Sequence, residues 1–476
     1  MLQEIKFESE IKKSMVHLAQ CDWVRDELSD ASFGDRRLLL RYLVVANHLA
    51  KHPEAPINQA SEVWKKAKAA YRFFDNKKVS AELVLRPHQR KTVERIKNHD
   101  GWVVIAQDTT YFNFSHMRES SDLGPIGDSR SCSRGLIAHN SLAMTAHGLP
   151  LGLIDQQIWA RSVAEHGKGR YRGKKPIEEK ESYIWIKALE TYCQILPEES
   201  KVVAVCDAEA DIYELFARAA PLHAKLLVRA TSNRVLEKET DKLWAFMERQ
   251  PVSATDTVEI TKQKDRPART AEVTIKFAEV KIACPANLRS RKYPPFITLS
   301  ATYVKEDDPP QDQDPLSWML LTNTETKTVS DAKTRIAWYK CRWQVEILHR
   351  IMKSGCKVER AQLEKNHRRF PYLAMNSIIS WKLLLLTHYS RIDPAAQATS
   401  LLTQTECDVL HSVTHGKVAT GRRFNAKKAT QWLAQLGGYM ARNSDPHPGP
   451  THVWRGWQRL QDFTHMYALA SHQNKV

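Results

Sequence analysis

The chain has 476 residues, 42% of them hydrophobic and 26% charged, which is typical of a folded globular protein with two or three domains and not of a disordered one. Its formal net charge of +17 favours nucleic acid as the partner, with an acidic membrane surface as the alternative. The eight cysteines show no C-x-x-C spacing, which argues against a disulfide framework and a zinc site. With the lack of an apolar N-terminal signal region, this pattern predicts an intracellular protein.

Residues 1–90 are predicted to form a basic, helical domain. A helical pattern over residues 35–46 places Arg37 and Arg41 on one side, and a second pattern over residues 61–74 carries several lysines and Arg72. Cationic helices of this kind can lie along the phosphates of a duplex. The alternative is the solvated face of a helical bundle.

Two short apolar runs rich in β-branched residues each end in an aspartate. Residues 103–108 end in Asp108, and residues 202–207 end in Asp207. Each run predicts a buried strand with its acid at or just past the carboxyl end, where open α/β sheets bind ligands. The structural alternative for either acid is a turn or a helix cap.

The elements between and after these strands predict an α/β fold. Strands are expected over residues 135–144, 149–155 and 225–229, with a basic loop at 161–175 and a helix near 180–195. This order is ribonuclease-H-like, and the alternating pattern within residues 235–325 predicts a β-strand insertion into that core. We therefore expect a catalytic domain over residues 91–370.

A long helix is predicted to begin at a capping box over residues 328–331 and to continue past residue 350. When this helix is projected at 100° per residue, six polar side chains fall within an arc of about 100° and form a polar stripe along it. Apolar residues border this stripe on both sides, which favours a stripe covered by protein or by a ligand. One carboxylate among several cations suits a polyanion and a metal ion, whereas the alternative is a helix with i,i+4 ion pairs. The six residues are Tyr339, Arg342, Glu346, His349, Arg350 and Lys353.

Residues 371–476 are predicted to be helical again. The most apolar stretch, 373–386, is too short and too polar to span a bilayer, so a core helix is expected and no membrane association. A last amphipathic helix is expected over residues 454–470.

Four motifs resemble the bacterial DDE transposases of the insertion-sequence-four group, nearly from end to end of the chain. Residues 70–73 (Ala-Tyr-Arg-Phe) resemble the N-terminal signature, 108–110 (Asp-Thr-Thr) the first acid, and 206–211 (Cys-Asp-Ala-Glu-Ala-Asp) the second. The pattern Tyr339-x2-Arg342-x3-Glu346-x6-Lys353 fits the family's Y-R-E-K motif at every spacing, and it is the most specific of the four.

The resemblance implies roles for individual residues. Asp108, Asp207 and Glu346 correspond to metal-binding catalytic acids, and Tyr339, Arg342 and Lys353 to phosphate contacts. The resemblance also implies that Arg229 contacts DNA near the acids and that Trp318 stacks on a flipped base. Contacts with the terminal repeats are implied for Arg37, Arg41 and Arg72. One departure is Thr231, where relatives have a lysine, so that contact is not expected here.

The resemblance further implies the reaction and its partners. Two Mg²⁺ ions per active site, with Mn²⁺ as a substitute, are expected to support cutting at terminal inverted repeats and joining of the 3′-OH ends to target DNA, through a hairpin intermediate. A homodimer paired by the C-terminal domain, residues 371–476, is expected in a synaptic complex with duplex DNA, in the bacterial cytoplasm at the nucleoid. The alternatives are a ribonuclease-H-like DNA nuclease and a non-catalytic DNA-binding protein derived from a transposase.

Overall fold

The computed structural model describes residues 23–473, apart from 62, 118–119, 128–130, 164–174, 261–267, 292 and 312. Most of the predicted basic loop at 161–175, and the first 22 residues of the predicted N-terminal domain, therefore lie outside the described residues. The chain divides into two compact units. Unit 1 comprises residues 1–103, 109–167 and 344–476, and unit 2 comprises residues 104–108 and 168–343.

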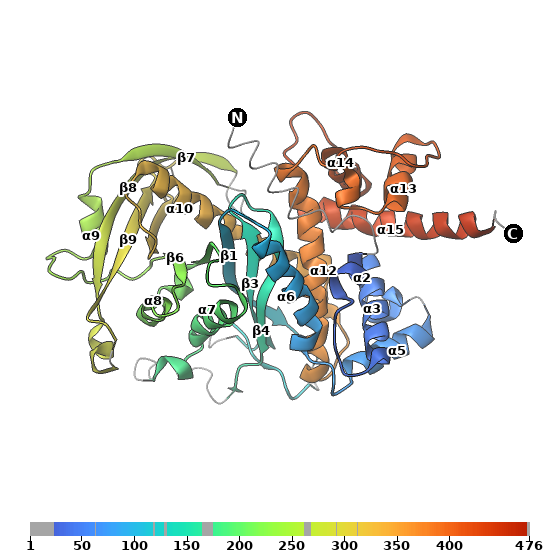
Figure 1. The fold of residues 1–476 in the computed structure, drawn as a ribbon, viewed down its shortest axis with the longest axis horizontal. Coiled ribbons are helices and arrows are strands. Elements are labelled where there is room, and N and C mark those ends of the chain that lie inside the picture. The colour runs from blue at the N-terminus through green and yellow to red at the C-terminus, as the bar shows by residue number, and fades with distance from the viewer. Residues whose placement is uncertain are drawn as a thin grey trace. The chain divides into compact units, whose positions relative to one another are not determined.

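The described part of unit 1 begins with the helices α2 (Trp23–Leu28), α3 (Arg36–Lys51), α4 (Ile57–Ala60), α5 (Trp64–Phe74) and α6 (Ala81–Lys97). Figure 1 shows α2, α3, α5 and α6. Asp35 caps α3 by accepting the Arg37 N–H, and Ser80 caps α6 by accepting the Leu83 N–H. Both predicted basic helices are therefore present, with α5 starting three residues later than expected. Their inner faces pack through the stacked and edge-on rings of Phe33, Tyr42 and Phe73.

A large mixed sheet has the strand order β2-β3-β1-β5-β6-β10-β9-β8-β7, with β4 paired to β3 off this path. The strands that cluster with unit 1 are β2 (Gly124–Pro125), β3 (Arg134–Thr145) and β4 (Pro150–Trp159), joined by antiparallel pairing. Strand β1 (Val103–Asn113) contributes residues to both units. The described chain thus has the mixed α/β architecture of a ribonuclease-H-like core.

Unit 2 contains the rest of the sheet: β5 (Val202–Cys206), β6 (Lys225–Arg229), β7 (Ala254–Ile260), β8 (Arg269–Ala283), β9 (Phe296–Lys305) and β10 (Ser317–Thr322). Strands β5 and β6 are parallel, whereas β10 is antiparallel to both β6 and β9. The described part of this unit contains the α-helices α7 (Tyr183–Ile195), α8 (Tyr213–Ala219), α9 (Leu243–Glu248) and α10 (Val329–Cys341). The β-rich segment predicted at 235–325 continues the sheet through the β6–β10 pair.

The predicted long helix is not continuous. The capping box is confirmed, since Thr328 accepts the Asp331 N–H and Asp331 accepts the Thr328 N–H at the start of α10. After Arg342 the chain continues as α11 (Trp343–Arg350) and then as a π-helical turn, Ile351–Gly355, where the Cys356 N–H donates to the Ile351 carbonyl. A π turn is wider than an α turn, so the projection at 100° per residue fails beyond Arg350.

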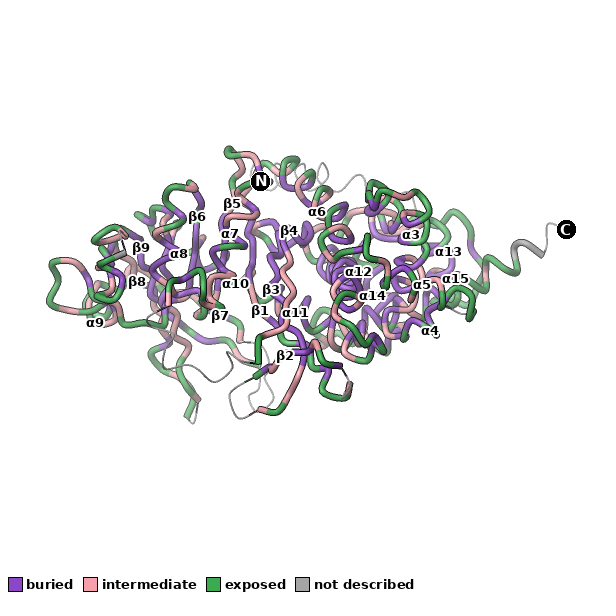
Figure 2. The backbone as a smooth tube through the Cα atoms, turned by 90° about the horizontal axis from the view of Figure 1, so that it is seen from below, coloured by how far each residue is buried: buried purple, intermediate pink, exposed green. Residues whose placement is uncertain are grey.

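The core of unit 1 lies around α12 (Asn366–Ile392), in which every residue from Pro371 to Tyr389 is buried. Figure 2 shows this helix as buried along most of its length. A helix that is buried on all sides is a core helix, as predicted. Among the described residues no helix is long and apolar enough to cross a membrane. The chain then continues through α13 (Gln404–His415), α14 (Ala426–Leu436) and α15 (Pro450–Gln473).

Candidate active site

Asp108 and Asp207 belong to unit 2 and come from neighbouring strands of the sheet, β1 and β5. The prediction that Asp108 ends its strand is wrong, because β1 continues to Asn113. The buried run of β1 does end at Gln107, and from Asp108 onward the strand is only partly covered. Asp207 follows β5 directly and accepts the Glu209 N–H at 2.9 Å, so it caps a short 3-10 turn.

The pKa of the Cys206 thiol responds to the charges of these two acids and of Arg342. Its pKa is raised well above the usual value, first by burial and then by the carboxylates of Asp207 and Asp108, while the Arg342 guanidinium opposes the rise. The pKa of Glu209 is also raised, by burial and by Asp207. Two acidic side chains and one guanidinium therefore share one neighbourhood in unit 2.

Arg342 lies between Asp108 and Tyr339. Its Nη1 atom is 3.9 Å from the Asp108 Oδ2 atom, and its guanidinium lies over the Tyr339 ring at 5.9 Å from the centroid. The Tyr339 side chain is buried, which raises its pKa, while Arg342 and Arg229 act to lower it. Because these side chains are largely desolvated, the ion pair is screened less than a surface pair would be.

Trp318 on β10 is half-buried, and its ring meets Tyr339 edge-on, with centroids 5.1 Å apart. Arg229, at the end of β6, donates from Nη2 to the Ser317 carbonyl at 3.3 Å. The structure thus gathers Arg229, Trp318, Tyr339 and Arg342 from three elements of unit 2.

Thr231, where a lysine was expected from the family resemblance, holds the loop after β6. Its N–H donates to the Asp211 Oδ2 atom at 2.9 Å, and Asp211 also accepts from Arg234 Nε at 2.9 Å. Asp211, in the second acidic motif, therefore has a structural role as the anchor of this loop.

Glu346 and His349 lie on α11 in unit 1, one turn apart. Glu346 is partly exposed, whereas His349 is buried and its Nε2 atom accepts from Asn140 Nδ2 at 2.9 Å. Asn140, on β3, in turn accepts from Gln156 Nε2 on β4 at 2.7 Å. A chain of three polar side chains, of which His349 and Asn140 are buried and Gln156 is half-buried, thus ties the helix that carries Glu346 to two strands.

The remaining predicted residues of the stripe lie at different depths. Arg350 is exposed and donates from Nη2 to Thr451 Oγ1 at 3.3 Å. Lys353 is half-buried in the π turn, with its ammonium 5.9 Å from the centroid of the Phe112 ring. Turns of π-helix occur often at functional sites.

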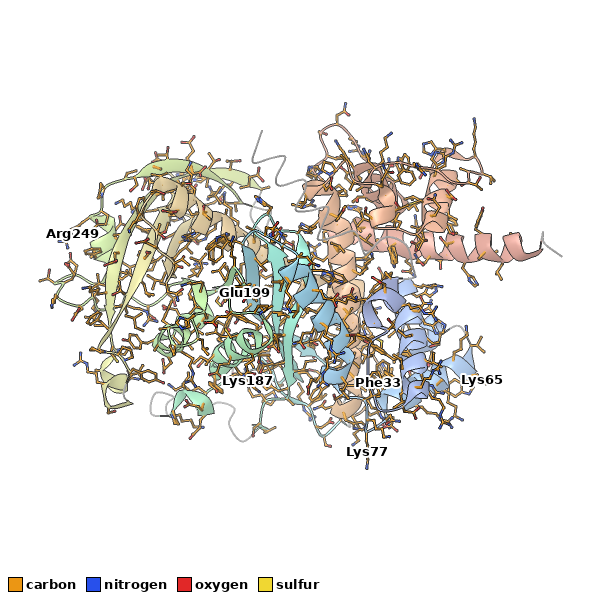
Figure 3. All side chains as sticks on the ribbon, in the orientation of Figure 1. Phe33, Lys65, Lys77, Lys187, Glu199 and Arg249 are labelled. Carbon is orange, nitrogen blue, oxygen red and sulfur yellow. The ribbon has the colours of Figure 1, made fainter. Side chains whose placement is uncertain are left out.

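Three arginines predicted to contact DNA, Arg37, Arg41 and Arg72, are exposed on α3 and α5. The Arg37 side chain is 94% exposed. Apolar side chains are exposed on the same helices, notably Leu40 and Trp64. Figure 3 shows Lys65 and Lys77 on this N-terminal region as well, so its outer surface is basic and partly apolar.

The chemistry of the predicted metal ligands suits a hard cation, since aspartate and glutamate supply only oxygen donors. Within the described residues, no group of three or more His, Cys, Asp or Glu side chains is placed to hold a metal ion. Each of the seven cysteines in the described part is a free thiol, in line with the predicted reduced state.

Asn140 and Gln156 are absent from the sequence-based prediction, although the sequence carries a signal for Asn140. Strand β3 has three consecutive polar residues, His139, Asn140 and Ser141, within an otherwise apolar run, and all three are fully buried. Burial lowers the pKa of His139 to about 3, and its Nδ1 atom lies 2.9 Å from Thr109 Oγ1. A polar cluster inside an apolar strand requires partners, and such a run indicates a buried hydrogen-bond network.

Two segments of the chain match known protein families. Residues 20–79 match the transposase DNA-binding family, and residues 186–381 match the transposase DDE domain. Together these matches support a DDE transposase, a nuclease-type enzyme with DNA as its partner. The first match contains Arg37, Arg41 and Arg72, and the second contains Asp207 and Glu346, whereas Asp108 lies outside both.

Proposed function

We propose that the chain is a metal-dependent cut-and-paste DNA transposase of the insertion-sequence-four group, similar to the Tn-five transposase. It cuts at the terminal inverted repeats of its transposon and joins the freed 3′-OH ends to target DNA through a hairpin intermediate. The observation that carries this proposal is that Asp108 lies on β1 and Asp207 directly follows the neighbouring strand β5, with Arg342 beside Asp108, in a chain with a DDE-domain match.

Asp108, Asp207 and Glu346 are the residues proposed to hold two Mg²⁺ ions, with Mn²⁺ as a substitute. When bound, two such cations supply activation of the attacking oxygen and stabilisation of the leaving oxygen in phosphoryl transfer. Their oxygen-only donors fit these hard cations.

The cations near the acids are proposed to hold the scissile strand. Arg342 and Tyr339 would bind phosphate oxygens beside Asp108, and Lys353, His349 and Arg350 would continue the contact along the helix that carries Glu346. Arg342 is placed for this by its contacts with Asp108 and Tyr339, and it lies at the C-terminal end of α10. An incoming phosphate would replace the Asp108 carboxylate as its partner when that carboxylate binds a metal ion.

Trp318 and Arg229 are proposed to hold a base flipped from the transposon end. Support comes from the half-buried indole, which leaves part of Trp318 open while Tyr339 fixes it from the side. An aromatic face of this kind stacks on any base.

The exposed arginines of α3 and α5 are proposed to read the terminal repeats, and α15 is proposed to pair two copies of the chain. Phe463, Met466 and Leu469 on α15 are 41%, 63% and 49% exposed, an apolar stripe at helical spacing that a second copy would cover.

The proposal is tested by Asp108→Ala, Asp207→Ala and Glu346→Ala in an assay that follows cleavage and joining of a transposon-end duplex. Each change should abolish both steps while end binding survives, because the end-reading arginines lie on other elements. Mg²⁺ or Mn²⁺ should support cutting, and Ca²⁺ should support assembly alone, since its looser geometry does not align an in-line attack.

Glu199→Ala, at an exposed acid of unit 2, is the matched control and should retain both steps. Cleavage by any of the three variants near the unchanged rate would reject the assignment of the acids. Cutting without joining would identify a ribonuclease-H-like nuclease in place of a transposase.

A further inference from the structure

The connection between α13 and α14 is a loop that lies outside both matched segments and is hydrogen-bonded to α13. Asp408 on α13 accepts the N–H groups of Gly421 and Arg422 at 3.0 and 2.9 Å. Ser412 Oγ accepts the Ala419 N–H at 3.0 Å, also from α13. Buried and polar side chains of α13 therefore fix the backbone of the loop, so its charged side chains start from defined positions.

Every exposed ionised side chain in this part of the chain, residues 404–436, is a cation. Its two acids, Glu406 and Asp408, are buried, the first in a capping box and in a hydrogen bond from Gln461, the second under the loop. The cations lie within twelve residues of one another and are all exposed, and no ion pair to any of them is found in the described residues. They are Lys417, Arg422, Arg423, Lys427 and Lys428.

The start of α14 adds to this positive field. Asn425 caps the helix, and its first turn contains Lys427 and Lys428 but no acid. Cations at a helix N-terminus oppose the helix dipole, which itself favours negative charge there. An anion bound at this point would neutralise the two lysine side chains and interact favourably with the helix dipole.

A cluster of rings holds α13 against α14 beside these cations. The His411 and His415 rings stack at 4.2 Å, His415 meets Trp432 edge-on at 4.9 Å, and Phe424 lies 4.7 Å from Trp432. The cluster joins both helices and the loop, so the cations project from a packed support. A preorganised surface loses less conformational entropy when it binds a ligand.

We propose that residues 416–428 form a second DNA-binding surface, which binds the phosphates of duplex DNA without reading its sequence. The ligand class follows from charge: five exposed cations without an exposed acid complement a polyanion with closely spaced phosphates. The surface is distinct from α3 and α5, which carry the proposed end-reading arginines. Assignment of the duplex as target DNA rests on the proposed function, whereas binding itself does not.

The test is a triple variant, Lys417→Gln, Arg423→Gln and Lys427→Gln, titrated with a short duplex of random sequence at several salt concentrations in EDTA. Loss of three phosphate contacts should reduce the slope of log affinity against log salt by about 2–3 and weaken binding about tenfold or more at 0.1 M salt. Since the three side chains are exposed, the melting temperature should not change.

The matched control removes three exposed cations from unit 2 by Lys187→Gln, Lys225→Gln and Lys238→Gln; Lys187 lies on α7 (Figure 3). It should leave the salt slope unchanged. Equal weakening by both triple variants would mean that only the overall charge acts, and no weakening by the loop variant would mean that the loop does not contact DNA; either result overturns the proposal. Loss of self-association by the loop variant with unchanged DNA binding would identify an interface between copies and would also overturn it.

The same variants separate this proposal from the proposed function. If the chain is a transposase, the loop variant should cut transposon ends normally and join them to target DNA more slowly. If neither protein cuts any end, the proposed function fails, and the difference in random-duplex binding still decides the role of the loop.

Discussion

Asn140 shows how much a single buried side chain contributes to the helix that carries Glu346. Its amide donates to His349 Nε2 and accepts from Gln156 Nε2, and the side chain is fully buried. We predict that Asn140→Leu lowers the free energy of unfolding by about 1–3 kcal/mol for each group left without a partner. Urea unfolding of the variant measures this loss.

The control is Asn376→Leu in α12. Asn376 is also buried, but its amide donates within its own helix, to the Tyr372 carbonyl, and its Oδ1 atom is without a partner in the described structure. This change should therefore cost less than Asn140→Leu. An equal loss for both variants would contradict the view that the His349–Asn140–Gln156 chain supports the helix.

Residue-level prediction succeeded where the signal is local. The cap at Asp207, which was the structural alternative for this acid, follows from its position just after a strand, and the capping box at Thr328 follows from the spacing of two side chains. The proximity of Arg342 to Asp108 depends on which strands and helices meet, which short-range periodicity does not encode. The family resemblance implied that Asp108 and Arg342 act at one site, but neither composition nor sequence spacing gives the distance between their side chains.

At the scale of elements, α14 and α15 approach each other at two glycines. A Cβ on Gly456 would lie 1.7 Å from the Leu433 carbonyl oxygen, and a Cβ on Gly437 would lie 1.9 Å from the His452 carbonyl oxygen. Both obstacles are backbone atoms, which cannot rotate away. The two helices therefore pack closely only because these positions lack a side chain.

We predict that Gly456→Ala destabilises the protein by about 1–3 kcal/mol, because overpacking outweighs the better helix propensity of alanine. The melting temperature measures the effect. Gly449→Ala is the control, since a Cβ at Gly449 meets no atom within 4 Å. A Gly456→Ala protein as stable as this control would show that the helices separate without cost.

The helices containing the stripe show why element boundaries resist prediction. Their polar and apolar residues fit one continuous α-helix, yet α10 ends at Cys341 and a π turn follows Arg350. A projection assumes a constant number of residues per turn, whereas this segment passes from an α-helix to a π-helical turn. The existence and position of the helical region were predicted correctly, and so was the covering of part of the stripe, since Tyr339 and His349 are buried. The break at Arg342 and the π turn at Lys353 were not predicted.

At the scale of the whole molecule, a buried ionic cluster joins N-terminal elements of unit 1 to its sheet and core helix. Glu27 of α2 pairs with Arg95 of α6 and accepts from His88 Nδ1 at 2.5 Å, while His88 Nε2 accepts the Leu153 N–H of β4. The Arg95 guanidinium also lies over the Trp381 ring of α12. Burial acts to raise the pKa of Glu27, but Arg95 and His88 outweigh it and hold the pKa at about 2.

Because folding lowers the pKa of Glu27 from 4.5 to about 2, its contribution to stability is complete above pH 4.5 and is lost as the pH falls toward 2. The shift in the pKa of Glu27 corresponds to about 3 kcal/mol.

We predict that Glu27→Gln destabilises the protein by about 3–5 kcal/mol at neutral pH, since it leaves Arg95 with a buried, uncompensated charge. It should also flatten the decline of stability between pH 4.5 and 2, measured by urea unfolding at each pH. Glu199→Gln, at an exposed site (Figure 3), should keep the parental decline, and a Glu27→Gln protein that keeps it too would show that another acid limits stability at low pH.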